Sequence, residues 1–220
     1  MDVKQLHIQP INRDDANEFV KRNHYSGKVA PNSQLHLGVF WGGKLEGVMQ
    51  FGPSIDKRKT QGLVSDTAWN GFLELNRMAF SDALPRNSES RAISVAMKLL
   101  RKHAPQVKWV ISFADGTQCG DGTIYRASGF VLTGIKKNQQ ILEMPDGSRV
   151  SKKALDHTRT TGGVYLSSLA RENGAKPLEG FQLRYVYFID RSYRAKLTVP
   201  EIPFVEIQQK GAAMYKGEKR

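Results

Sequence analysis

Residues 72–115 read FLELNRMAFSDALPRNSESRAISVAMKLLRKHAPQVKWVISFAD, and this stretch decides the class of fold. Residues 72–80 are largely apolar and predict a strand. Residues 88–103 carry apolar side chains at helical spacing and end just before a proline, so they predict an amphipathic helix. Residues 107–114 are rich in β-branched and aromatic side chains, which is typical of a buried strand. A strand, a helix and a second strand in succession indicate a mixed α/β chain.

The segments on either side continue this alternation. Asn12 precedes an acidic first turn, and residues 13–23 then have apolar side chains at helical spacing. Residues 53–70 are polar and predict a long loop. We expect further helices at residues 123–128, 151–156 and 164–173, and strands at 35–40, 45–51, 130–134, 140–144 and 182–189. The pattern as a whole predicts an α/β (α+β) fold, with a mixed central sheet flanked by helices.

The chain has 220 residues with 33 Lys or Arg against 21 Asp or Glu, which gives a formal net charge of +12. With 40% hydrophobic and 25% charged residues, it has the composition of a globular protein and not of a disordered one. An excess of positive charge favours a polyanionic partner, either nucleic acid or an anionic membrane surface. Many basic proteins bind neither specifically, so charge alone leaves the partner open.

The sequence argues against a membrane or secreted protein. No apolar run approaches the roughly 20 residues that a membrane span requires. The N-terminal residues lack the pattern of a secretory signal. The single cysteine, Cys119, excludes an intrachain disulfide framework and a zinc site of clustered cysteines. We therefore expect a protein of a reducing cytoplasm that does not enter a membrane.

The positive charge is unevenly distributed along the chain. Residues 1–148 have a net charge of +5, whereas residues 149–220 have +7 in half the length. This asymmetry predicts a catalytic core at 1–148 and a basic extension at 149–208 that packs on it. Residues 209–220 are rich in Gly and Lys and predict a flexible tail.

Two parts of the pattern resemble the GNAT N-acyltransferase fold. The first is the strand 72–80 with its turn and the helix that begins near Ser88. The second is the segment Tyr125-Arg126-Ala127-Ser128-Gly129-Phe130, which resembles a tyrosine-to-Gly-Phe signature on a short helix. The resemblance implies that acetyl-CoA binds at the first junction, with its pyrophosphate on the helix N-terminus. It also implies that Tyr125 donates a proton to the departing thiolate.

The segment that would hold the pyrophosphate departs from the family pattern. It reads Arg86-Asn87-Ser88-Glu89-Ser90-Arg91 and contains no glycine, so close approach of the backbone is harder. Its serines and arginines can bind phosphate through their side chains instead. The cofactor-binding residues that we expect are Arg77, Arg86, Ser88, Ser90 and Arg91.

A closer resemblance is to the Mom family of GNAT-like enzymes, which modify adenine in phage DNA. Five short motifs carry it, in the same order and at similar separations: His24-Tyr25-Ser26-Gly27, Glu74-Leu75-Asn76-Arg77-Met78, Ser88–Arg91, Phe113-Ala114-Asp115 and Ile124-Tyr125. The match covers most of residues 15–205. It implies a transferase that converts adenine in double-stranded DNA to N6-carbamoylmethyladenine, uses iron, and protects phage DNA from restriction in the cytoplasm of a bacterial host.

The resemblance implies His24, Tyr25, Asp115 and Tyr125 as catalytic residues, and ordinary structural explanations compete with these roles. In the functional interpretation His24 is a base or a metal ligand. In the structural interpretation it is a surface side chain that the dipole of the preceding helix stabilises. Asp115 follows a strand end where α/β sheets place ligands, or it is a turn residue before Gly116. An imidazole and a carboxylate can bind a divalent metal, and the Mom resemblance implies that this metal is iron, so we expect Fe(II) at His24 and Asp115.

Two further residues have alternative roles. Two roles are open for Tyr125. Either its phenol donates a proton to a thiolate, or its ring only packs beside Phe130. Arg77 lies inside an apolar strand, where a charge needs a partner. That partner is Glu74 or Glu89 in an ion pair, or a phosphate of the cofactor.

Several basic residues are candidates for DNA contacts. The extension supplies Lys152, Lys153, Arg191 and Arg194, which we expect to bind phosphates of duplex DNA. The run Lys57-Arg58-Lys59 has the simpler interpretation of a solvated face. Adenine N6 is buried in its base pair, so an enzyme that acts on duplex DNA flips the base out.

Two other functions stay open. A conventional acetyl-CoA-dependent N-acetyltransferase of a protein or small amine needs neither metal nor DNA, but the missing glycines and the basic charge count against it. A non-enzymatic DNA-binding protein on a GNAT-like scaffold binds DNA with strong salt dependence and leaves the bases unaltered. The oligomeric state is open as well, with a homodimer among the possibilities.

Overall fold

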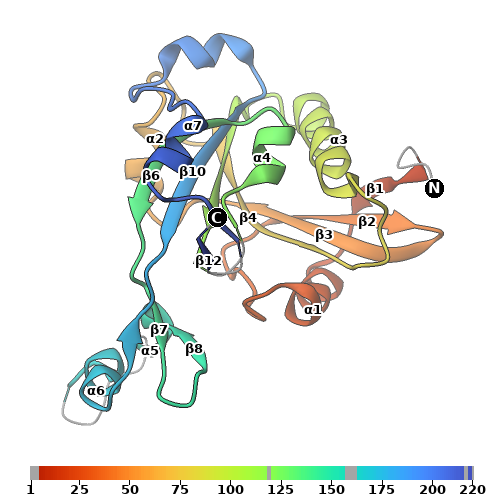
Figure 1. Ribbon diagram of the computed structural model, residues 1–220. Coiled ribbons are helices and arrows are strands. Elements are labelled where there is room, and N and C mark those ends of the chain that lie inside the picture. The colour runs from red at the N-terminus through yellow and green to blue at the C-terminus, as the bar shows by residue number, and fades with distance from the viewer. Residues whose placement is uncertain (1–4, 118–119, 157–162, 216–217, 220) are drawn as a thin grey trace. The chain divides into compact units, whose positions relative to one another are not determined.

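The computed structural model describes residues 5–117, 120–156, 163–215 and 218–219 (Figure 1). Cys119 lies outside these residues. The chain divides into two compact units. The core unit comprises residues 1–113, 123–133 and 184–202, and the second unit comprises residues 114–122, 134–183 and 203–220.

The described residues include a mixed sheet of seven strands, in the order β1-β2-β3-β4-β5-β10-β6, and most of its residues belong to the core unit. Its strands are β1 His7–Pro10, β2 Leu35–Trp41, β3 Lys44–Gly52, β4 Phe72–Phe80, β5 Trp109–Asp115, β6 Val131–Lys137 and β10 Phe181–Phe188. Strands β1 to β4 pair antiparallel with their neighbours, whereas β4 and β5 are parallel. Strand β10 is the last of the seven in the chain, yet it lies between β5 and β6.

Strands β4 and β5 pair at their N-terminal ends. Residues 72–74 lie opposite residues 109–111, and beyond them the described backbones of the two strands no longer pair. There the hydroxyl of Ser112 donates to the carbonyl of Leu75 at 3.3 Å. The C-terminal halves of the two central strands are therefore not joined by a backbone ladder.

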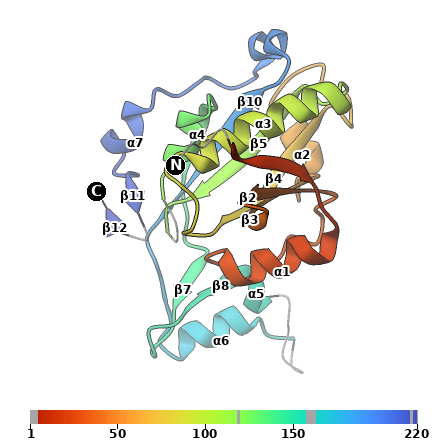
Figure 2. The ribbon, with the colours of Figure 1, turned by 90° about the vertical axis from the view of Figure 1, so that its right-hand side faces the viewer.

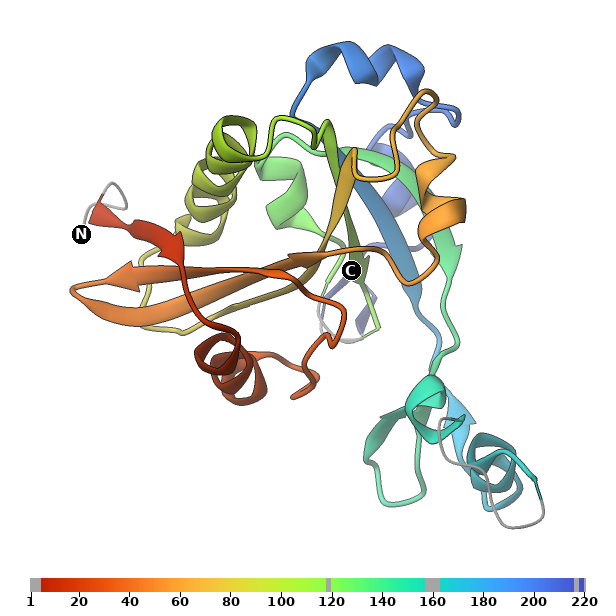
Figure 3. The same cartoon turned by 180° about the vertical axis from the view of Figure 1, so that it is seen from behind.

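Two longer helices, α1 Arg13–Asn23 and α3 Ser88–His103, lie on opposite faces of the sheet (Figure 3). Asn12 begins α1, because its Oδ1 accepts a hydrogen bond from the N–H of Asp15 at 2.8 Å. The apolar stripe of α1 buries Ala16 and Val20 fully. The shorter helices of the core unit are α2 Lys57–Gln61, α4 Thr123–Ala127 and the 3-10 helix η2 Arg191–Lys196.

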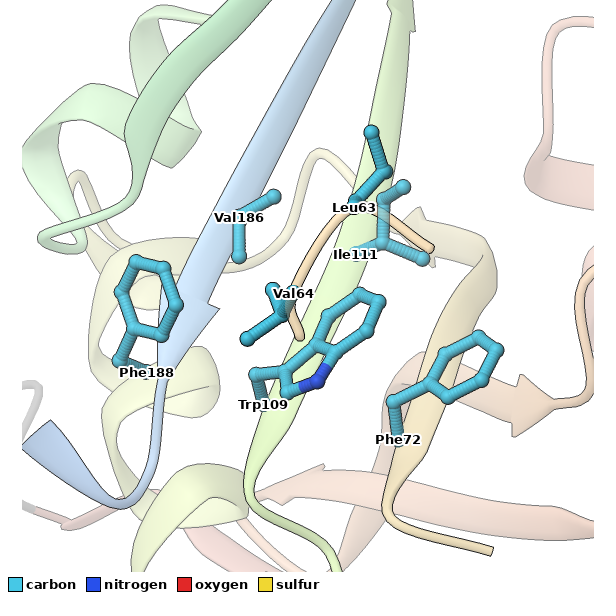
Figure 4. Close-up of a cluster of buried hydrophobic side chains, with 7 residues drawn as sticks. All are labelled: Leu63, Val64, Phe72, Trp109, Ile111, Val186 and Phe188. Carbon is cyan, nitrogen blue, oxygen red and sulfur yellow. The ribbon is translucent and has the colours of Figure 1, made fainter. Parts of the chain in front are cut away.

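The buried cluster beside β4, β5 and β10 is built around Trp109 (Figure 4). The indole stacks on Phe72, with ring centroids 4.4 Å apart and an interplanar angle of 6°. Its Nε1–H donates to Oγ1 of Thr67 at 3.0 Å, so the polar atom of the buried indole is paired. The other members of the cluster are Leu63, Val64, Ile111, Val186 and Phe188. This cluster ties the connection between β3 and β4 to the central strands.

The second unit has a small sheet of its own, in the order β8-β7-β9. Its elements are β7 Ile141–Glu143, β8 Arg149–Ser151, β9 Lys176–Pro177, α5 Lys152–Asp156, α6 Leu166–Glu172, α7 Val205–Gln209, β11 Met214–Tyr215 and β12 Glu218–Lys219. Leu142, Ala170 and Ala175 form its buried apolar cluster. Strands β11 and β12, which pair antiparallel, fall within residues 209–220.

The structure confirms the predicted fold class, a mixed central sheet flanked by helices. Residues 53–70 were expected to form a loop, and they contain the helix α2 instead. Asp56 begins this helix, because its side chain accepts a hydrogen bond from the N–H of Lys59 at 3.3 Å. Strand β10 falls within residues 149–208, so the expected extension supplies a strand to the large sheet. No helix of the described residues has the length and hydropathy that crossing a membrane requires.

Replacing Trp109 by alanine is expected to lower the free energy of unfolding by about 3–5 kcal/mol, because it leaves a large cavity in the core. Trp69→Ala is the matched control, since the Trp69 side chain is 54% exposed. Urea unfolding followed by circular dichroism measures both variants. Equal losses of stability would contradict a core built around Trp109.

Candidate active site

A hollow of about 270 Å³ opens at the start of α3. Helix α4 lies beside this end of α3, as Figure 2 shows. The hollow is lined by the turn before α3, the first turn of α3, and α4: Leu84, Pro85, Arg86, Asn87, Glu89, Ser90, Thr123, Ile124 and Ala127. The two segments that carry the GNAT resemblance therefore border one hollow of the core unit.

Asn87 lets the chain enter α3 without a glycine. Its backbone is left-handed, with φ 71° and ψ 10°, a conformation that asparagine adopts more readily than most residues. Its side chain does not cap the helix, and within the described structure the N–H groups of Glu89 and Ser90 donate to no acceptor. Unpaired N–H groups at the positive end of a helix dipole are suited to binding a phosphate.

The predicted phosphate ligands around this turn differ in their surroundings. Arg86 is exposed and lines the hollow. Ser90 also lines the hollow, and the Ser90 hydroxyl donates to the Asn87 carbonyl at 3.1 Å. Ser88 is fully buried, and its hydroxyl donates at 2.6 Å to the carbonyl three residues earlier, so it braces the turn. The Nε of Arg91 is buried and has no hydrogen-bond partner among the described residues. The residues of the hollow, with its unpaired N–H groups, fit the pyrophosphate of CoA.

Aromatic neighbours hold Tyr125 in place on α4. Its ring centroid lies 5.3 Å from the centroids of both Phe130 and Tyr185. Gly129 has a φ of 84°, which ends α4 and lets the N–H of Phe130 donate to the Tyr125 carbonyl at 3.1 Å. The tyrosine-to-Gly-Phe signature is thus a helix C-cap. The packing of Tyr125 beside Phe130 is confirmed, and its role as a proton donor stays a prediction.

His24 follows α1 as its C-cap and is half-buried. Its Nδ1 accepts a hydrogen bond from the N–H of Ser26 at 3.2 Å and lies 2.8 Å from Oγ of Ser26. Burial, with a smaller effect of the Arg77 charge, lowers the pKa of His24 to about 4. The imidazole is therefore neutral at pH 7, and because Nδ1 accepts, its proton lies on Nε2. The helix dipole by itself would shift this pKa in the opposite direction.

Tyr25 lies against His24, with ring centroids 4.2 Å apart and an interplanar angle of 33°. The Tyr25 side chain is 51% exposed, so one part of the ring contacts the imidazole and another part is open to solvent. The pair thus presents a hydrogen-bond donor and an aromatic surface at the same place in the core unit.

Arg77 joins β4 to the loop that follows His24. Its Nε donates to the carbonyl of Lys28 at 3.0 Å, and a terminal N–H donates at 2.7 Å to the carbonyl of the preceding residue. Among the described residues Arg77 forms no ion pair with Glu74 or Glu89, so the expected carboxylate partner is wrong. Backbone carbonyls satisfy the guanidinium instead, and its positive charge acts on His24.

Asp115 ends β5 and forms a turn. Its Oδ1 accepts hydrogen bonds from the N–H of Thr117 at 3.0 Å and from the side-chain amide of Asn138 at 3.3 Å. Within the described part of the chain, no three side chains of His, Cys, Asp or Glu are grouped so that they could hold a metal ion. The ligand set that Fe(II) at His24 and Asp115 would need is therefore not supplied by these residues.

The basic residues expected to contact DNA differ in how their charges are compensated. Arg194 forms two hydrogen bonds of 2.6 Å with the carboxylate of Glu201, so its charge is paired. Arg191, in the same helix η2, is exposed. Lys152 is half-buried at the start of α5. Lys153 also belongs to α5, and its side chain lies outside the described structure.

Sequence reasoning missed two residues of this site. Asn87 stands where the GNAT pattern has glycines, and an asparagine in such a position is the signal that could have found it. Ser26 follows His24 by two residues, a spacing at which short polar side chains bond locally to the backbone. Neither residue carries recognisable chemistry of its own.

The model of the Mom protein family matches residues 5–206. The chain belongs to the Mom family. A relative, the methylcarbamoylase mom of Escherichia phage Mu, is 38% identical over 197 residues, which cover 88% of this chain and 80% of the phage protein. The Mom resemblance predicted from the short motifs is thus confirmed. A methylcarbamoylase transfers a chemical group, so this Mom-family chain is a transferase.

Solved structures similar to this Mom-family chain are acetyltransferases. A Bacillus subtilis acetyltransferase in complex with CoA has a TM-score of 0.48 at 11% identity, and the match covers 83% of this chain and 98% of that chain. The ribosomal-protein-S18-alanine N-acetyltransferase of Escherichia coli has a TM-score of 0.44 at 12% identity, with 84% and 94% covered. A GNAT-family acetyltransferase of Streptococcus pneumoniae has a TM-score of 0.44 at 12% identity, with 83% and 98% covered.

Asn87→Gly is expected to keep the free energy of unfolding within about 0.5 kcal/mol of the unmodified chain, because glycine adopts a positive φ freely. Asn87→Val is expected to lower it by about 1–2 kcal/mol, since a β-branched residue is strained in this conformation. Urea unfolding of the two variants measures the difference. A glycine variant as unstable as the valine variant would rule out a left-handed entry to α3.

Arg77→Gln is expected to raise the pKa of His24 from about 4 toward its ordinary value of 6.5, because it removes a positive charge near the imidazole. Burial remains, so the rise is partial. Arg13→Gln is the matched control, since the Arg13 charge lowers the pKa of His36 and not that of His24. An NMR titration of the imidazole resonances reports both groups. An unchanged His24 pKa in Arg77→Gln would mean that Arg77 does not act on it.

Proposed function

We propose that this Mom-family transferase converts adenine in double-stranded DNA to N6-carbamoylmethyladenine and thereby protects phage DNA from restriction in the cytoplasm of a bacterial host. The observation that carries the proposal is the 38% identity to a phage methylcarbamoylase across 88% of the chain. The matched family region, residues 5–206, includes His24, Tyr25, Asp115 and Tyr125. The net charge of +12 is consistent with a polyanionic substrate.

Acetyl-CoA is the donor that the hollow at the start of α3 fits. We expect its pyrophosphate to accept hydrogen bonds from the N–H groups of Glu89 and Ser90 and to pair with Arg86. When bound, acetyl-CoA supplies a two-carbon acyl unit on a thioester. A carbamoylmethyl adduct also requires an amide nitrogen and a two-electron oxidation at the carbon that joins N6, so acyl transfer is one part of the reaction. The described residues offer no ligand set for Fe(II) and supply neither the oxidant nor the nitrogen, so the roles below are limited to binding, orientation and proton transfer by protein groups.

The residues that the Mom resemblance implies have distinct expected roles in the reaction. The phenol of Tyr125 donates its proton to the departing thiolate. Neutral His24 donates a hydrogen bond from Nε2 and orients the base, since its low pKa keeps it from acting as a cation at pH 7. The half-exposed ring of Tyr25 offers a face on which a flipped adenine can stack. Asp115 is the expected acceptor of the proton that the exocyclic amine loses.

The proposal is tested by the composition of cellular DNA. The chain is expressed in bacteria, the DNA is digested to nucleosides, and adenosine is analysed by mass spectrometry. We expect a carbamoylmethyl adduct on deoxyadenosine that carries label when the cells are fed isotopically labelled acetate. An unmodified adenine pool from folded protein, in cells infected with a phage that supplies any further factor, would overturn the proposal. Acetylated protein or amine without DNA adduct would favour a conventional acetyltransferase instead.

Tyr125→Phe is expected to lower adduct formation by about 10²-fold or more, because it removes the proton donor and keeps the ring packed between Phe130 and Tyr185. Tyr187→Phe is the matched control, since that tyrosine also packs against Phe130, with ring centroids 5.3 Å apart. The adduct is quantified per adenosine in cells with equal amounts of protein. Equal losses in the two variants would argue against a proton donor at Tyr125.

A further inference from the structure

The connection between β3 and β4 is an ordered part of the core unit. It contains helix α2, whose first three residues are Lys57, Arg58 and Lys59. The side-chain amide of Gln61 donates to the carbonyl of Thr67 at 2.6 Å, and the hydroxyl of Thr67 donates to the carbonyl of Val64 at 2.7 Å. Thr67 in turn accepts from the Trp109 indole. The run of three basic residues therefore stands on a scaffold that is anchored in the core.

Helix η2 lies against the same connection. The N–H of Ser65 donates to the carbonyl of Lys196 at 2.9 Å, and the N–H of Thr198 donates to the carbonyl of Leu63 at 2.9 Å. Val64 and Leu197 form an antiparallel β-bridge between the two segments. Figure 3 shows η2 next to the connection that carries α2. Segments far apart in the sequence thus form one surface within the core unit.

The charges on this surface are of two kinds. Three of its basic side chains are paired with acids: Lys196 with Asp66 at 3.4 Å, Lys108 with Asp190 at 3.5 Å, and Arg194 with Glu201 at 2.6 Å. By contrast, Lys57, Arg58, Lys59 and Arg191 form no ion pair with any residue in the described ranges. Lys57, Arg58 and Lys59 are consecutive on α2, where Asp56 is the capping acid, and Arg191 begins the helix η2 that joins this connection. The excess of positive charge on these two neighbouring elements raises the local potential.

Two large apolar side chains stand among these charges. The side chain of Ile55 is 79% exposed and that of Trp69 is 54% exposed. The ammonium group of Lys57 lies 4.4 Å from the centroid of the Trp69 ring, so the two side chains support each other. Exposed aromatic and apolar groups between cations are suited to a nucleic-acid backbone, which offers phosphates to the cations and sugars to the apolar groups.

We infer that one surface of the core unit binds the backbone of the duplex DNA substrate. We name it the α2 surface, and it consists of Ile55, Lys57, Arg58, Lys59, Trp69 and Arg191. This inference rests on the proposed function and assigns the DNA-holding surface for it. Of the basic residues that the sequence favoured, it retains Arg191 and excludes Arg194, whose charge is already paired.

The position of the α2 surface in the fold agrees with this role. The connection that carries it begins at the end of β3, where the side-chain amide of Asn32 donates to the carbonyl of Pro53. Asn32 belongs to the loop between α1 and β2, the loop that begins at His24. A duplex held on the α2 surface therefore meets the core unit at the end of the sheet from which the His24 loop projects.

The test measures binding of a short fluorescein-labelled duplex by anisotropy over a series of KCl concentrations. The variant Arg58→Gln/Lys59→Gln/Arg191→Gln is expected to reduce the slope of log K against log [KCl] by about 2–3, since each lost phosphate contact removes about 0.9. Trp69→Ala is expected to weaken binding several-fold with an unchanged slope. The matched control, Lys21→Gln/Lys98→Gln/Lys102→Gln, removes the same charge from exposed positions on α1 and α3 and is expected to keep most of the slope.

The outcomes separate this inference from the proposed function. If the unmodified chain forms the DNA adduct and the α2-surface variant has the slope of the control variant, the α2 surface is not the binding surface and the proposed function stands. If the unmodified chain neither binds the duplex nor forms the adduct, both fail. Loss of binding to vesicles of anionic phospholipid, with duplex binding intact, would assign the surface to a membrane and overturn the inference. Circular dichroism of each variant establishes that it is folded.

Discussion

The short parallel contact between β4 and β5 is the constraint on which the rest of the core unit depends. It joins residues 72–74 to residues 109–111, and the stacked pair of Phe72 and Trp109 buries it on one side. Because the backbone ladder stops there, the last residues of both strands can take part in other contacts. The turn after β4 leads to the N-terminus of α3, where Glu89 and Ser90, whose N–H groups have no acceptor among the described residues, line the hollow. The two strands are thus paired to each other at their start, in the buried cluster, whereas their later residues are not paired to each other and lead toward the hollow.

The surroundings of His24 determine both the charge of its imidazole and the position of its proton. The guanidinium of Arg77 is held in place by hydrogen bonds to two backbone carbonyls. Burial and the charge of this guanidinium keep the imidazole neutral, and Ser26 fixes which nitrogen carries the proton. The result is an oriented N–H donor and not a group that changes charge near neutral pH. Such a donor suits recognition of an uncharged heterocycle better than binding of a phosphate.

Local sequence signals predicted much of this fold and less of the site. The cap at Asn12 and the apolar spacing of residues 88–103 identified α1 and α3 because both helices are encoded by near neighbours in the chain. Helix α2 was missed because its five residues are polar, it is capped by Asp56, and the residues that follow it are held by residues 196–198. The partner of Arg194 could not be predicted, since nothing in the sequence pattern distinguishes Glu201 from any other surface acid. Whether a basic side chain is paired with an acid depends on its neighbours in the folded structure. The sequence therefore identified candidate DNA-contacting residues but not which of them have an unpaired charge.

The place of β10 in the sheet has a consequence for how the chain folds as it is made. Strand β10 fills the position between β5 and β6, but it is synthesised after both, with residues 138–180 in between. Until it arrives, β5 and β6 present open edges that can pair with other chains. The small sheet β8-β7-β9 is built from the intervening residues, and the N–H of Asn138 donates to the carbonyl of Gly180 at 2.7 Å, so the two ends of that segment meet. Local folding of the segment shortens the loop that β10 must close. We therefore expect early folding of residues 138–180 to shorten the time during which the unfinished sheet is exposed to aggregation.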